Sequence, residues 1–259
     1  MGDGKAQPDQ SLAEARTFAY QYWSERYAEA RLASKFEEEI MDEAHDLVQF
    51  AVTADTRSSM ILLVSFLEDT LKKVFVNEWK IESKKEMDRF FGGSGPLATF
   101  SQRALVAAGV GWIEKEAVTE FDTLRKIRNT FAHDHRMIKI EGSDLVGLVT
   151  SLPPREQVWL YKEEYKDHFE KADEETKLKM RVFCSGLMLV AHLLLNSKMI
   201  ATGIPKGFRS GSGFKNKFEI EQAMIDATIR YCWIATGQVY EGKVYEYRRS
   251  RDISPKVGD

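Results

Sequence analysis

The chain has 259 residues, of which 43% are hydrophobic and 30% charged, and its formal net charge is −3. This length can bury a sizeable core, and the composition indicates a globular rather than a disordered protein. Charge is uneven, because residues 1–54 sum to −6 and residues 199–259 to +3. Such an asymmetry can place a basic surface near an acidic one, although ordinary solvated helix faces give the same pattern.

The cysteines and the apolar stretches indicate in which cellular compartment the protein is expected. Cys184 and Cys232 lie in apolar stretches without metal-ligand spacing, which predicts reduced core thiols rather than a disulfide framework. The first residues hold no apolar run of the kind that marks a signal peptide. The longest apolar stretch, Val182–Leu195, is too short to span a membrane and is typical of a core helix. We therefore expect a cytoplasmic protein with no membrane partner, metal or cofactor.

Helical signals dominate the first part of the chain. An acidic amphipathic stretch covers roughly 11–52, begins at the capping box Ser11–Glu14, and is expected to break near Ala33-Ser34. It carries an aromatic face formed by Phe18, Tyr20, Tyr22, Trp23 and Tyr27. Such a face suits packing on the core or on a protein partner. A second helix is predicted from Asp55 or Thr56 to about Glu78, with apolar residues at helical spacing.

Two further capping boxes, Ser83–Glu86 and Thr99–Gln102, predict short helices. Between them, the glycine-rich loop 92–96 ends in a proline and lacks the Gly-Lys-Ser/Thr of a phosphate-binding loop, so we interpret it as a bundle turn. A fourth helix is predicted over about Ile113–His133. Its inward-facing residues are Val118, Phe121, Leu124, Ile127 and Phe131.

The second half of the chain completes a predicted all-α fold. Met137–Ile140 and Val158–Tyr161 could be short strands around a small helix at 143–152, and Glu174–Met199 should be the central helix. A last helix is expected over about 218–236, and 238–247 could form a β-hairpin or continue that helix. The predicted organisation is an acidic helical extension (1–54), a helical bundle (55–200), and a linker, helix and basic appendage (201–259).

The end of the fourth helix, Arg125–His133, is the candidate site. At about 100° per residue Arg125, Asn129 and His133 share one stripe, and Arg128 lies about 7.5 Å from His133 along the axis. A histidine can take the 2′-OH proton of RNA or protonate the leaving oxygen, and an arginine can hold the phosphate. The set predicts metal-independent RNA cleavage by Arg128, Asn129 and His133, with His135 as a second candidate proton carrier.

This segment resembles the Arg-Asn-x-x-x-His signature of the HEPN group of helical domains. Three pieces in order resemble the mannitol operon repressor family within that group, and together they span about residues 50–200. They are Asp55-Thr-Arg57 followed by Ser65-Phe-Leu-Glu68, then Gly95-Pro-Leu-Ala-Thr-Phe-Ser101, and Leu124–His133. Where the family has Gly after its first Arg, this chain has Ser58. The resemblance implies a small helical bundle that commonly forms a homodimer.

We further expect Arg125, His135, Glu68, Asp55 and Arg57 to support the site or to bind RNA. Many HEPN members are metal-independent ribonucleases of toxin or defence systems, and others are non-catalytic binding domains. The repressor family is named for transcriptional repression, yet this chain shows no helix-turn-helix pattern, zinc ligands or basic recognition helix that would read DNA sequence.

Three interpretations of the motif stay open. The first is a homodimeric endoribonuclease. The second is a non-catalytic regulator of transcription that binds a protein partner through the N-terminal aromatic helices. The third is a structural role, in which Arg128, Asn129 and His133 cap the helix end or pair with Glu68 or Asp55.

Overall fold

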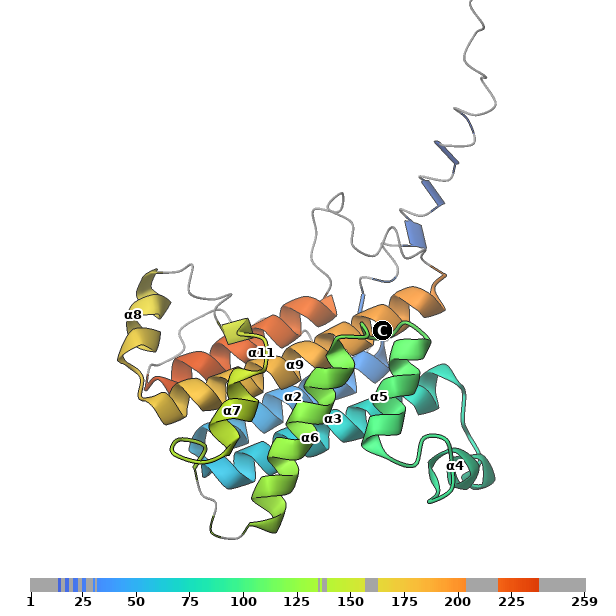
Figure 1. Cartoon of the computed structure of the whole chain (residues 1–259). Coiled ribbons are helices and arrows are strands. Elements are labelled where there is room, and N and C mark those ends of the chain that lie inside the picture. The colour runs from blue at the N-terminus through green and yellow to red at the C-terminus, as the bar shows by residue number, and fades with distance from the viewer. Residues whose placement is uncertain are drawn as a thin grey trace, which may run out of the picture.

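The computed structural model describes residues 14, 17–18, 21–22, 25–26, 30, 32–134, 136, 139–156, 163–203 and 219–237. Within these ranges every regular element longer than a single turn is an α-helix, which confirms the predicted all-α class (Figure 1). The helices are α2 Lys35–Thr53, α3 Thr56–Glu78, α4 Lys84–Phe91, α5 Phe100–Gly109, α6 Ala117–His133, α7 Leu145–Thr150, α8 Glu163–Lys171, α9 Glu174–Ala201 and α11 Glu219–Ala235.

Local capping explains where several helices begin. The predicted break near Ser34 is confirmed, because Ser34 forms a capping box with Glu37 at the start of α2. The predicted boxes at Ser83 and Thr99 start α4 and α5, and the Asp55 carboxylate accepts a 2.9 Å hydrogen bond from the Ser58 N–H at the start of α3. The box predicted at Ser11 lies outside the described residues. The capped starts therefore follow from side chains within three residues of each boundary.

The helix α9 is the centre of the bundle, as the sequence predicts. It packs against α3, α6, α7 and α11 (Figure 1), and most of its own side chains between Val182 and Leu194 are buried. It is also the one helix of the described part that is long and apolar enough to cross a membrane. Because 72% of its most apolar window is buried inside the protein, packing within the bundle accounts for its hydrophobicity.

The regions before residue 55 and after residue 201 share this core. The helix α11 packs on both α9 and α2, and α2 also packs on α3. Between α9 and α11, the rings of Phe183 and Tyr231 stack with centroids 4.0 Å apart, and the free thiols of Cys184 and Cys232 touch with sulfur atoms 3.5 Å apart. Residues 40–51 and 220–232 thus belong to one hydrophobic core with the bundle between them.

One helix start, one helix that was not predicted and one expected strand differ from the prediction. The helix α6 begins at Ala117 rather than near Ile113, since Gly111 has a φ of +81° and Trp112 and Ile113 turn into the core. The sequence did not predict α8. At Ile140 the backbone is not in a strand, because the Glu175 carboxylate accepts hydrogen bonds from the N–H groups of Ile140 and Glu141 at 2.8 and 2.7 Å. The other expected strand and the hairpin at 238–247 lie outside the described residues.

A close approach of α9 to α3 gives a first prediction. A Cβ added at Gly186 would lie 3.0–3.2 Å from three carbon atoms of the Leu63 side chain in the core. Gly186→Val should therefore lower the free energy of unfolding by about 1–3 kcal/mol, measured by urea denaturation, because it overpacks this crossing. The control is Gly147→Ala in α7, where an added Cβ meets nothing within 4 Å. Equal stability of both variants and the wild type would contradict the crossing described here.

Candidate functional site

The predicted apolar face of α6 fixes the orientation of the candidate site. Phe121, Leu124, Ile127 and Phe131 are fully or almost fully buried, and α6 packs through them against α3 and α5. The opposite side of the helix consequently carries the polar residues of the motif. The carboxyl end of α6 lies beside the amino-terminal turn of α3, as the contacts of Arg57 described below show.

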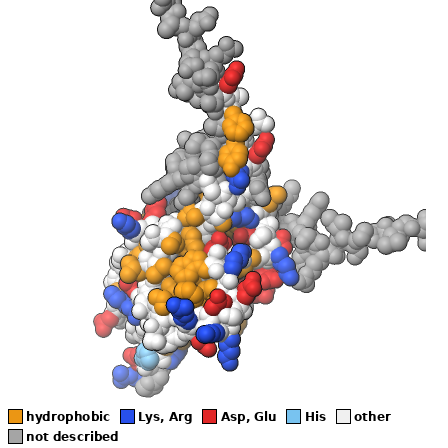
Figure 2. All heavy atoms as spheres, turned by 90° about the vertical axis from the view of Figure 1, so that its right-hand side faces the viewer, with side chains coloured by type: hydrophobic (Ala, Val, Ile, Leu, Met, Phe, Trp, Pro, Cys, Tyr) orange, Lys and Arg blue, Asp and Glu red, His pale blue; other side chains and the backbone are white. Residues whose placement is uncertain are grey.

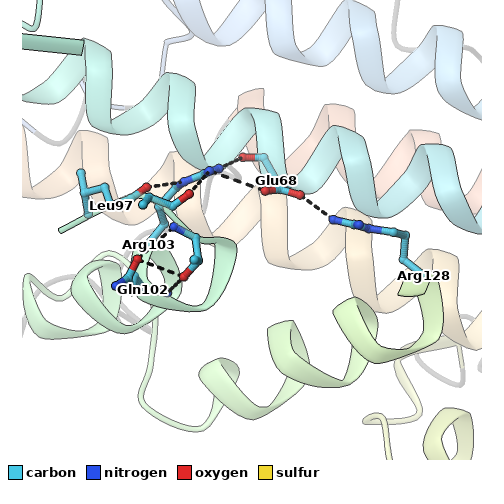
Figure 3. Close-up of polar contacts among 7 residues, drawn as sticks. Glu68, Leu97, Gln102, Arg103 and Arg128 are labelled. Atoms are coloured by element: carbon cyan, nitrogen blue, oxygen red, sulfur yellow. Dashed lines mark hydrogen bonds and ion pairs between the residues drawn. The ribbon is translucent and has the colours of Figure 1, made fainter. Parts of the chain in front are cut away.

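Arg128 takes part in an ion-pair network between three helices (Figure 3). Its Nη2 atom lies 2.8 Å from Oε2 of Glu68 on α3, and the other carboxylate oxygen of Glu68 lies 3.5 Å from Nη2 of Arg103 on α5. Glu68 therefore sits between two guanidinium groups. Among the pairings left open by the sequence, the geometry gives Arg128 the pairing with Glu68, which draws the guanidinium toward α3.

Arg103 is a residue of this network that the sequence analysis missed. Its side chain is only 9% exposed, and it donates to the backbone carbonyls of Leu97, Ala98 and Glu68 at 2.9, 3.3 and 3.2 Å. Burial lowers the pKa of the Arg103 guanidinium, against the opposing effect of the nearby Glu68. A lone arginine among the apolar residues of 100–109 was the signal that could have revealed it, since buried arginine requires partners.

The side chain of Arg57, which belongs to α3, contacts the carboxyl end of α6. Its Nη1 donates to the backbone carbonyl of Asp134 at 3.2 Å, and its Nη2 lies 3.5 Å from the carbonyl of Ala132. These carbonyls belong to the residues on either side of His133. Cationic groups at a helix carboxyl end satisfy free carbonyls and offset the negative end of the helix dipole. The capping role that one interpretation gave to Arg128, Asn129 and His133 is thus filled by Arg57, which comes from another helix.

His133 and Asn129 remain available to a ligand. The His133 side chain is exposed, Asn129 is half-buried, and neither side chain has a hydrogen-bond partner within the described residues. Arg125 lies on the same stripe, and its Nε is 3.4 Å from the Asp122 carboxylate. His135 lies outside the described residues. The predicted stripe of Arg125, Asn129 and His133 is therefore present on α6, and two of its three side chains are unengaged.

Asp55 does not join this polar set. Both of its oxygens accept from Ser58, at 2.9 Å from the backbone and 2.7 Å from the hydroxyl, so the carboxylate serves the start of α3. These hydrogen bonds lower the pKa of Asp55, because they stabilise its charged form. The Asp55 side chain forms no hydrogen bond or ion pair with the described residues of α6.

Comparisons of the chain with protein-family models, with curated proteins and with solved structures give no match. In the described part of the chain, no group of three or more His, Cys, Asp or Glu side chains could hold a metal ion. The site therefore consists of the exposed imidazole of His133 at the end of α6 and the guanidinium of Arg57, which contacts the backbone carbonyls of the residues before and after His133.

Proposed function

We propose that the protein is an endoribonuclease that cleaves RNA without a metal at the carboxyl end of α6, in a defence or toxin-like setting. The observation that supports this proposal best is the exposed His133, which has no side-chain hydrogen bond within the described residues and whose two neighbours, Ala132 and Asp134, bind the guanidinium of Arg57 through their carbonyls. An imidazole can exchange protons near neutral pH, and a guanidinium can stabilise the charge that develops on a phosphate. The resemblance to the HEPN group supports the same class of reaction.

The reaction begins when the neutral imidazole of His133 takes the proton of a ribose 2′-OH. The 2′-oxygen then forms a bond to the adjacent phosphorus, and the bond from phosphorus to the 5′-oxygen breaks. The 5′-oxygen receives a proton from an imidazolium, which His133 of a second copy would supply in a two-fold dimer. The products are a 2′,3′-cyclic phosphate and a 5′-hydroxyl. Asn129, one turn before His133, is placed to orient the imidazole or the phosphate.

The test is cleavage of a labelled mixed-sequence RNA by purified protein in the presence of EDTA. We expect His133→Ala to lose roughly 100- to 10,000-fold in the rate of cleavage, because it removes the proton carrier. The matched control is Lys126→Ala, which removes an exposed cation from the same helix and should cleave like the wild type. Circular dichroism must show both variants folded. Cleavage by His133→Ala at the wild-type rate would exclude this site.

A second candidate function is a non-catalytic regulator that binds a protein partner. It is favoured by exposed aromatic residues at the amino-terminal side, where the rings of Phe18 and Tyr22 stack at 6.3 Å and Phe18 is 73% exposed. Figure 2 shows further hydrophobic side chains gathered on the face of the bundle that carries α4 and α5. Exposed apolar patches of this kind often mark protein interfaces. Phe18→Ala with Tyr22→Ala should then abolish partner binding, whereas His133→Ala should leave it intact.

A further inference from the structure

The arginines around the end of α6 differ in their charge partners. Arg128 pairs with Glu68 at 2.8 Å, Arg125 with Asp122 at 3.4 Å, and Arg136 with Asp134 at 3.6 Å. Arg57 has no carboxylate within ion-pair distance among the residues the structure describes, and its two hydrogen bonds go to neutral backbone carbonyls. Of these four guanidinium groups, Arg57 is the one without an ion-pair partner in the part of the chain that the structure describes.

Arg57 and Arg128, the two candidates for binding the phosphate, are held at different points along α3. Arg57 lies in the first turn of α3, and Glu68, which holds Arg128, follows eleven residues later. At about 1.5 Å per residue, these two points on α3 are about 16 Å apart along the helix axis. Arg57 contacts the carbonyls that flank His133, whereas Arg128 is held toward the middle of α3. Of these two arginines, it is therefore Arg57 whose guanidinium contacts the carbonyls that flank His133.

The end of a helix is by itself a poor place for a phosphate. The last carbonyl groups of α6 point outward and form the negative end of the helix dipole, which repels an anion. Arg57 changes this environment, because it places a cation on those carbonyls. A guanidinium has five N–H donors, and the described contacts use one from each Nη atom, so that three remain for another acceptor.

We infer that Arg57, rather than Arg128, holds the phosphate that His133 acts on. This inference rests on the proposed ribonuclease function and assigns the cation of its site. Arg57 binds a non-bridging oxygen of the scissile phosphate while His133 takes the 2′-OH proton, and the negative charge that builds up at phosphorus is stabilised at the guanidinium. Arg128 acts instead through Glu68 and Arg103, by holding α6 on α3 and α5.

The experiment compares wild type, Arg57→Ala, Arg57→Lys and Arg128→Gln. Cleavage is measured with the labelled RNA in EDTA, and affinity with a fluorescein-labelled 2′-O-methyl RNA, which lacks the 2′-OH nucleophile. For Arg57→Ala we expect kcat/KM to fall at least 100-fold, since a charge-stabilising donor is lost. The slope of log Kd against log salt should fall in magnitude by about 0.7, which corresponds to one lost phosphate contact on a single strand.

The conservative variants separate a binding role from a structural one. Arg57→Lys keeps the charge and should keep the wild-type salt slope, although it loses about tenfold in kcat/KM because lysine lacks the planar fork. Arg128→Gln should lower the melting temperature but leave the salt slope unchanged, because its charge faces Glu68. A purely structural role of Arg57 would lower the melting temperature of Arg57→Ala without altering the slope.

The outcomes also separate this inference from the proposed function. If the wild type neither cleaves the RNA nor binds the 2′-O-methyl probe, the ribonuclease proposal and the assignment of Arg57 both fail. If the wild type cleaves and Arg57→Ala cleaves within threefold of it, the function stands and the assignment of Arg57 is wrong. Loss of cleavage together with a fall of about 0.7 in the salt slope, in a folded Arg57→Ala protein, supports both.

Discussion

Replacing Glu68 by alanine should lower the free energy of unfolding by about 2–4 kcal/mol, because it leaves two guanidinium groups without their carboxylate. The side chain of Arg103 is 9% exposed, and those of Arg128 and Glu68 are 27% and 28% exposed. Removing one partner of a fully buried pair costs about 3–5 kcal/mol, and the exposure of Glu68 reduces that value through solvent screening. Urea denaturation followed by circular dichroism measures the change.

The control for this prediction is Glu43→Ala, which removes one of the two carboxylates that pair with Lys73 on the surface and leaves Asp69 at 2.8 Å. The pair of Lys73 and Glu43 is as short, at 2.7 Å, but its side chains are 35% and 45% exposed. Its loss should cost less than about 1 kcal/mol. Glu68→Gln should fall between the two, since an amide oxygen still accepts from a guanidinium but carries no charge. If Glu68→Ala were as stable as Glu43→Ala, the network in Figure 3 would contribute little to holding α6.

Glu120→Ala should have a comparable effect at the other end of α6, with a loss of about 3–4 kcal/mol. Both carboxylate oxygens of Glu120 accept from Nη2 of Arg155, at 2.8 and 3.0 Å, and one of them also accepts from the Ser185 hydroxyl at 3.1 Å. The side chains of Glu120 and Arg155 are 11% and 22% exposed, and removing Glu120 leaves Arg155 without an ion pair among the described residues. The measurement is again the midpoint and slope of urea unfolding.

The matched control is Glu170→Ala in α8, where an exposed i, i+4 pair with Lys166 has a separation of 3.8 Å. We expect a change of at most about 0.5 kcal/mol there. A loss below 1 kcal/mol for Glu120→Ala would mean that the segment after α7 is not anchored to α6 by this pair. Taken together, the Glu68 and Glu120 variants test whether ion pairs at two points of α6 fix the helix that carries His133.

Helix positions could be predicted largely from the sequence, because their causes are local. The starts of α2, α3, α4 and α5 follow from Ser34, Asp55, Ser83 and Thr99, each of which bonds within the next three residues. The inward face of α6 follows from the spacing of its apolar residues. The start of α6 was misplaced because apolar residues at 112–113 fit a helix pattern, while their burial is achieved by a turn at Gly111.

The sequence by itself determined which polar residues share the exposed stripe of α6, since helical periodicity fixes their angles. Only the tertiary structure decided which charges neutralise one another. Arg128 meets Glu68 across 60 positions of sequence, and Arg57 reaches the end of α6 across more than 70. Those pairings depend on how α3, α5 and α6 pack, which no local pattern encodes. For this reason the motif identified the helix that carries the candidate site, whereas packing determined that Arg128 pairs with Glu68 and that Arg57 binds the carbonyls on either side of His133.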